Sequence, residues 1–218
     1  MQKRYTRKLS FNERIFVVAD RLYPPLANQF IFEGTGVIDI ERWRSAVETA
    51  SEANPGSRAV LKGVLNTCRW VDSGITPPVI IAEKGNYEWD KPETVPYFTR
   101  PLYPELGPTC EVVIAGGDTM RVIFRTHHAL MDGMGTFVWV TDIFRALRGE
   151  PCVGSRATIT DTELAHSFQK EMRKPYPTEH IAPTGRAEGN ESGMLTRRIR
   201  VRGRYHNLLA QVALQIAR

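Results

Sequence analysis

The residues best suited to chemistry lie together in the middle of the chain. The segment His127-His128-Ala129-Leu130-Met131-Asp132-Gly133 follows an expected strand directly and precedes an expected helix. Side chains at such a junction are held by a rigid strand and remain accessible in the loop. A histidine there is suited to general base catalysis, because an imidazole titrates close to neutral pH. Asp132 could neutralise a cation or fix the loop, and Gly133 permits a sharp turn into the helix.

Other interpretations of this segment remain open from the residues alone. Both histidines could be structural. A metal site is disfavoured because neighbouring strand residues point to opposite faces, so His127 and His128 would not converge on one ion. A serine hydrolase is disfavoured because the sequence contains no GxSxG nucleophile elbow.

The strand before the histidines belongs to an expected β-hairpin. Residues 110–115 and 119–126 flank Gly116-Gly117-Asp118, and glycine accepts the positive φ that such a turn requires. In the second strand the side chains alternate between two faces, with Met120, Val122 and Phe124 on one and Arg121, Ile123 and Arg125 on the other.

Helix signals surround this hairpin. Ser10-Phe11-Asn12-Glu13 fits a capping box that begins a helix, which Pro24-Pro25 ends. Asp39 caps a second helix that Asn54-Pro55-Gly56 stops. We expect further helices over residues 133–148, 161–173 and 205–217.

The remaining segments complete an alternation of strands and helices. Extended segments are expected over residues 29–33, 58–65, 68–72, 79–82 and 195–201, and residues 84–108 are expected to form a loop. This order predicts an α/β layered fold with a mixed β-sheet covered by helices. We predict a first lobe over residues 1–175, a linker or loop over 176–193, and the opening strand and helix of an incomplete second lobe over 194–218.

The charge distribution adds a second candidate feature. The chain carries a net charge of +5, and five arginines lie within eight positions: Arg197, Arg198, Arg200, Arg202 and Arg204. Arg198, Arg200 and Arg202 fit the solvent-exposed face of a strand, with Ile199 and Val201 on the other face. Alternatively, the arginines form a patch for the phosphates of a coenzyme, an acidic carrier protein or nucleic acid. Nucleic acid is the weakest of these, because no nucleic-acid-binding motif accompanies the arginines.

Cysteine content and hydropathy predict a cytoplasmic protein. Cys68, Cys110 and Cys152 are dispersed, so they indicate reduced thiols and neither a disulfide framework nor a zinc site. No run approaches the roughly 18 apolar residues of a membrane-spanning helix. The basic N-terminus is not followed by the apolar stretch of a signal peptide.

The segment from His127 to Gly133 resembles a known family signature. It matches the HHxxxDG motif of the condensation-domain and CoA-dependent acyltransferase superfamily, which includes nonribosomal peptide condensation domains and chloramphenicol acetyltransferase. The helix that begins near Ser10 and the passage from Asn54 to Arg58 also resemble that family. The resemblance implies a chloramphenicol acetyltransferase-like lobe in an enzyme of secondary metabolism, such as nonribosomal peptide synthesis.

The resemblance also implies a role for each motif residue. His128 is the catalytic residue, which either takes a proton from the acceptor or positions it. His127 is structural and turned inward, and Asp132 pairs with an arginine, for which Arg58 is the candidate. Gly133 keeps space open beside His128 for the thioester. No metal or cofactor is implied, since acyl-phosphopantetheine on a carrier protein or acyl-CoA is the substrate and a small-molecule amine or alcohol is the acceptor.

The chain also departs from the family pattern. Family members have two lobes, whereas this sequence matches the first lobe and lacks a DFGWG-like element. We therefore expect a second-lobe polypeptide or another copy of the chain as partner, with no nucleic acid and no membrane. The alternative is a non-catalytic, condensation-like interaction module. His127 and Asp132 also have the H-x4-D spacing of glycerolipid acyltransferases, whose accompanying elements are absent.

Overall fold

Two β-sheets form the framework of the computed structural model. It describes residues 4–64, 67–83, 87–89, 91, 95–117, 119–168, 203, 205–209 and 211–212. An antiparallel three-stranded sheet has the order β1 (Thr6–Lys8), β4 (Arg69–Asp72), β3 (Ala59–Lys62). A four-stranded sheet has the order β2 (Ala27–Gly34), β7 (Met120–His127), β6 (Cys110–Ala115), β5 (Val79–Ile81). The β5–β6 pair is parallel and the other pairs are antiparallel, so the larger sheet is mixed, as predicted.

The helices begin where the sequence offers caps. Ser10 and Glu13 form the capping box of α1 (Phe11–Leu22), and Asp39 caps α2 (Ile40–Ala53). A short 3-10 helix, η1 (Pro55–Arg58), follows α2. The others are α3 (Pro96–Thr99), α4 (Gly133–Leu147) and α5 (Asp161–Ser167). The short α3 lies in a segment that we expected to be entirely loop.

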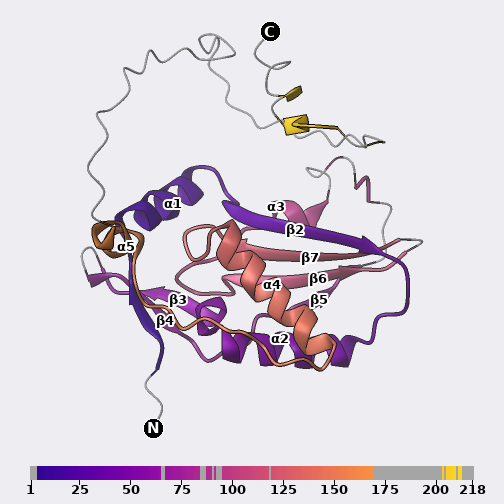
Figure 1. The fold of residues 1–218 in the computed structure, drawn as a ribbon, viewed down its shortest axis with the longest axis horizontal. Helices are drawn as coiled ribbons and strands as arrows, with labels where there is room; N and C mark the ends of the chain where they lie inside the picture. Colours follow the sequence, from indigo (N-terminus) through magenta and orange to yellow (C-terminus); the bar gives the residue numbers. More distant parts are fainter. Residues whose placement is uncertain are drawn as a thin grey trace.

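Helices cover both faces of the larger sheet. The packed helices α2 and α4 lie on one face (Figure 1). There Trp43 and Trp139 enclose Phe124 of β7 in the main core. On the other face Ile123 packs with Phe98 of α3 in a smaller cluster. The predicted α/β class with a mixed sheet covered by helices is therefore confirmed.

The face of β7 that carries Arg121 and Arg125 is largely buried, although it contains two charged side chains. Arg125 is fully buried, where it donates to the Glu111 carboxylate and to the Arg100 carbonyl. Burial lowers the pKa of Arg125, and the neighbouring Glu111 partly opposes that effect. Arg121 pairs instead with Glu33 across the β2–β7 ladder.

Some predicted elements lie wholly or partly outside the described residues. These are the last part of the helix over 161–173, the linker over 176–193, the strand over 195–201 with its arginine cluster, and the last part of the final helix. The lobe boundary near residue 175 therefore remains a prediction. Within the part of the chain that the structure describes, no helix has the length and apolar character needed to cross a membrane.

Candidate active site

Strand β7 delivers the two histidines to the junction between the larger sheet and α4. The motif loop, residues 127–133, is fixed by its backbone: the N–H of His128 donates to the Leu26 carbonyl (2.9 Å), and the N–H of Leu130 donates to the His127 carbonyl (2.9 Å). The same loop therefore contacts the chain just before β2 and closes a tight turn. The turn places the two adjacent histidines in different environments, with His127 buried and His128 partly exposed.

His127 points into the protein, as expected. Its side chain is fully buried, and its Nδ1 accepts the N–H of Ala129 at 3.1 Å. Its Nε2 lies 3.4 Å from Asp20 Oδ2 of α1. Burial lowers the pKa of His127, and the Asp20 carboxylate opposes this only in part. The ring is accordingly neutral at pH 7, with its proton on the Nε2 that faces Asp20.

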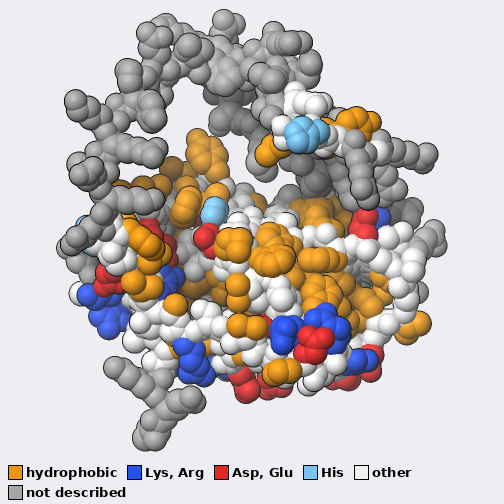
Figure 2. Space-filling model, viewed as in Figure 1, with side chains coloured by type: hydrophobic (Ala, Val, Ile, Leu, Met, Phe, Trp, Pro, Cys, Tyr) orange, Lys and Arg blue, Asp and Glu red, His pale blue; other side chains and the backbone are white. Residues whose placement is uncertain are grey.

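His128 lies beside a large cavity. The cavity has a volume of about 660 Å³, and its wall near the ring includes Phe16, Met131 and Val138. The imidazole stacks on the Phe16 ring, with 4.4 Å between centroids and 14° between planes. Its Nδ1 is buried and has no hydrogen-bond partner among the described residues, so Nε2 is the nitrogen left to face the cavity. Figure 2 shows hydrophobic side chains gathered on this face of the molecule, over α1 and α4.

The expected pair between Asp132 and Arg58 is wrong. Asp132 is the N-cap of α4, and its Oδ1 accepts the N–H of Gly135 at 2.7 Å. Arg58 instead makes two hydrogen bonds to Asp72 of β4, at 3.1 and 2.7 Å. An aspartate directly before a helix satisfies an unpaired backbone donor without a cation. The loop is held by this cap, and Arg58 braces the smaller sheet.

The glycines after Asp132 differ in their surroundings. Gly133 is exposed, and a Cβ added there would meet no atom within 4 Å, so open space surrounds it. Gly135 lines the cavity, and a Cβ there would lie 3.4 Å from both Asp132 Oδ1 and Met131 Cβ. The closer packing is therefore at Gly135, which the sequence did not single out.

Comparisons with known proteins give matches among solved structures only. No family model and no curated protein matches the chain. The tallysomycin biosynthesis protein TlmII matches with a TM-score of 0.55 and 18% identity, over 67% of this chain and 39% of that one. The starter condensation domain of the rhizomide synthetase RzmA matches with a TM-score of 0.52 and 18% identity, over 69% of this chain and 40% of that one. The fold is condensation-domain-like.

The likeness reaches the fold and covers part of those structures. The chain spans about two-fifths of the length of the structures it matches. A variant of the RzmA starter domain, similar at a TM-score of 0.52, was solved in complex with C8-CoA, and another with C8-CoA and Leu-SNAC. The expectation of a condensation-domain-like lobe is thus confirmed at the level of fold.

Two residues that sequence reasoning missed, Asn28 and Arg7, hold the motif loop in place. Asn28 of β2 donates through Nδ2 to the Met131 carbonyl at 2.7 Å and lies 3.3 Å from Thr136 Oγ1 of α4. Arg7 of β1 donates to the Leu130 carbonyl at 3.3 Å and pairs with Glu13 of α1. These contacts join β1, α1 and β2 to the loop of the condensation-like fold.

A connecting segment, the cavity strap (residues 150–160), forms another wall. Its start is anchored by the buried Asp142 carboxylate, which accepts the N–H groups of Val153 and Gly154, each at 2.8 Å. Gly154 has φ of 72°, and a Cβ there would lie 2.8 Å from the Ala53 carbonyl oxygen, so a glycine is required. Beyond it, alternate residues line the cavity: Ser155, Ala157 and Ile159.

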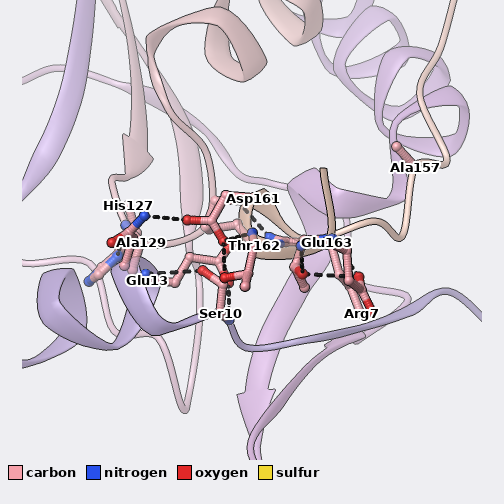
Figure 3. Close-up of polar contacts among 12 residues, drawn as sticks. Arg7, Ser10, Glu13, His127, Ala129, Ala157, Asp161, Thr162 and Glu163 are labelled. Atoms are coloured by element: carbon pink, nitrogen blue, oxygen red, sulfur yellow. Dashed lines mark hydrogen bonds and ion pairs between the residues drawn. The ribbon is translucent and has the colours of Figure 1, made fainter. Parts of the chain in front are cut away.

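The strap ends at a polar cluster beside the start of α1. Asn12 donates to the Asp161 carboxylate, and Thr160 and Glu163 form the capping box of α5. Figure 3 shows Ser10, from the start of α1, close to Asp161 and Thr162 of α5. The Tyr5 hydroxyl donates to the Ala157 carbonyl at 3.1 Å, which ties the middle of the strap to the N-terminal segment. The cavity beside His128 is therefore bordered by α1, α4 and the strap.

The described residues hold no set of three or more histidine, cysteine or acidic side chains placed for one metal ion. Cys68, Cys110 and Cys152 are free thiols. Burial raises the pKa of the Cys110 thiol far above its ordinary value, so this side chain is a protonated core group.

Proposed function

We propose that this chain is the motif-bearing lobe of a condensation-type acyltransferase. It transfers an acyl group from a CoA or carrier-protein thioester to an amine, and His128 acts at the reacting nitrogen. The observation that carries the proposal is the half-buried His128 ring at the wall of the 660 Å³ cavity. The condensation-domain-like fold supports it, as do the C8-CoA and Leu-SNAC bound by variants of the RzmA domain.

The chemical step requires one base and no redox partner. The acceptor nitrogen attacks the thioester carbonyl carbon, a C–N bond forms and the C–S bond breaks. The nitrogen loses a proton to His128 Nε2, and that proton then passes to the departing thiolate. A base held in this way accelerates a reaction by about 10²–10⁴. Nδ1 of His128 has no hydrogen-bond partner among the described residues, so no contact fixes which ring nitrogen carries the proton. In the competing form of the proposal Nε2 carries it, and Nε2–H binds the acceptor or the carbonyl oxygen.

The charge of the cavity wall favours an amine over an alcohol acceptor. The wall contains the carboxylates of Glu13, Asp132 and Asp161 and one guanidinium, that of Arg7. Because Arg7 pairs with Glu13, the wall holds two further carboxylates, those of Asp132 and Asp161, and no second lysine or arginine among the described lining residues. Such a wall attracts a protonated amine as it enters. The amine loses that extra proton to solvent before it attacks, so that His128 is neutral and free to take the second proton.

The test uses the chain together with the second-lobe polypeptide proposed below, C8-CoA as donor and Leu-SNAC or its 2-hydroxy analogue as acceptor, with products followed by mass spectrometry. We expect the amide with Leu-SNAC and at least tenfold less ester. His128→Ala is expected to lower kcat by about 10²–10⁴. His166→Ala is the matched control, because His166 lies exposed on α5 outside the cavity wall. Equal turnover by the His128→Ala protein would remove this side chain from the mechanism.

We also propose a second-lobe polypeptide as the partner that completes the cavity. The exposed apolar residues of α1 support this, because Ile15 lines the cavity and all four lack cover among the described residues: Phe11, Ile15, Val18 and Leu22. Sedimentation of the chain alone and with C8-CoA tests the competing arrangement, a second copy. A monomer that turns over C8-CoA and Leu-SNAC unaided would contradict both.

A further inference from the structure

The His128 ring is held without the hydrogen bond that commonly orients a catalytic imidazole. In many such sites a carboxylate or carbonyl accepts the proton of one ring nitrogen and so fixes the ring. Here Nδ1 is buried and has no partner in the described part of the chain. The ring contact that the structure does provide is with Phe16, nearly parallel at 14° and 4.4 Å away.

One turn along α1, Asp20 contacts the other histidine. Its Oδ2 lies 3.4 Å from His127 Nε2, and its Oδ1 accepts the Leu26 N–H at 2.6 Å. The Leu26 carbonyl in turn accepts the N–H of His128 at 2.9 Å. Asp20 is itself buried, with 8% of its surface exposed. It therefore contacts both the His127 ring and the backbone segment that holds His128.

Phe16 and Asp20 share one face of α1, because residues four apart in a helix are neighbours on its surface. The start of α1 is fixed to the motif loop through Arg7, which binds both Glu13 and the Leu130 carbonyl. We propose that α1 orients both imidazoles, with Phe16 as the positioning residue for His128 and Asp20 as the positioning residue for His127. The kinetic part of this inference rests on the proposed function, whereas the ring geometry does not.

The geometry is tested by NMR of the full chain labelled at histidine. The ring protons of His128 lie over an aromatic face, so we expect them upfield of those of the exposed His166, with assignment by His128→Gln. Phe16→Leu keeps an apolar side chain but removes the aromatic face, and it is expected to abolish the upfield shift. Phe16→Tyr keeps the face and is expected to preserve the shift. Val18→Ala, on an exposed position of the same helix, is the control.

Asp20 is tested by the tautomer of His127, read from its ring ¹⁵N shifts. The wild-type ring is expected to carry its proton on Nε2, because Nδ1 accepts from Ala129. Asp20→Asn keeps an acceptor for Leu26 but can turn an N–H donor towards Nε2, so we expect a changed tautomer or broadened signals. His127 signals that are the same in the Asp20→Asn protein as in the wild type would refute this role.

Kinetics with C8-CoA and Leu-SNAC separate positioning from binding. Phe16→Leu is expected to lower kcat by about tenfold with KM unchanged, because the base is misoriented while the cavity persists. Phe16→Tyr is expected to restore kcat. Unshifted His128 protons in the wild type, or equal shifts in wild type and Phe16→Leu, would overturn the inference. If wild type forms no product even with the second-lobe polypeptide present, while the shifts behave as expected, the proposed function fails and the orientation by α1 stands.

Discussion

The replacement of the Asp132–Arg58 pair by a helix cap is testable by a double-mutant cycle. Asp132→Ala removes the acceptor of the Gly135 N–H, and loss of such a cap costs about 1 kcal/mol in the free energy of unfolding. Arg58→Ala leaves Asp72 without its cation. These two side chains are only 16% and 10% exposed, so we expect a cost of about 3 kcal/mol, the lower end for a buried pair.

The two costs should add, because the side chains have different partners. Additivity holds within about 0.5 kcal/mol for independent sites, whereas a direct pair shows coupling of about 0.5–3 kcal/mol. We therefore expect negligible coupling between positions 132 and 58, and clear coupling between positions 58 and 72. Urea unfolding followed by the fluorescence of the buried Trp70 and Trp139 measures all the variants.

Asp132→Asn distinguishes the cap from an ion pair. Asparagine is about as good an N-cap as aspartate but carries no charge, so this variant should lose only a few tenths of a kcal/mol. An ion pair would be lost in Asp132→Asn as fully as in Asp132→Ala. Coupling above about 1 kcal/mol between positions 132 and 58 would refute the cap interpretation and restore the pair that the family resemblance implied.

Three further predictions concern stability and reactivity. Asn28→Ala leaves the Met131 carbonyl without its donor and should cost about 1–3 kcal/mol; an unchanged urea midpoint would argue against this support of the loop. Iodoacetamide at pH 8 should modify Cys68 well before Cys110, whose pKa burial raises, and equal rates in peptide mapping would contradict its burial. Burial lowers the pKa of His127, so the unfolded state binds more protons as the pH falls below about 6.5, and stability should decrease there. His127→Gln should lose part of this slope; parallel stability curves would rule out the assignment.

Features encoded by neighbouring residues could be predicted from the sequence. The capping box at Ser10, the cap at Asp39 and the β6–β7 hairpin depend on residues a few positions apart, and the structure has all three. Asp132 belongs to this class too, since an aspartate before a helix is itself a cap signal. The family resemblance directed attention to Arg58 instead.

The supports of the site could not be predicted, because they join segments distant in sequence. Asn28 lies 103 residues from the Met131 carbonyl that it binds, and Arg7 lies 123 residues from Leu130. No periodicity marks either residue. Alternation placed Arg125 on one face of β7, but its full burial depends on Glu111 in the neighbouring strand, and one sequence cannot specify that pairing.

In the cavity strap, the residue that anchors the wall differs from the residues that shape the cavity. Asp142 is outside the lining, yet it also accepts from Asn54, so one carboxylate joins α4, the end of α2 and the strap. Ser155 and Ala157, by contrast, have small side chains that face inward. A larger side chain at either position would reduce the volume of the cavity beside His128, while the strap stayed in place. The size of the cavity can thus be changed at two small residues, with the Asp142 tether left unchanged.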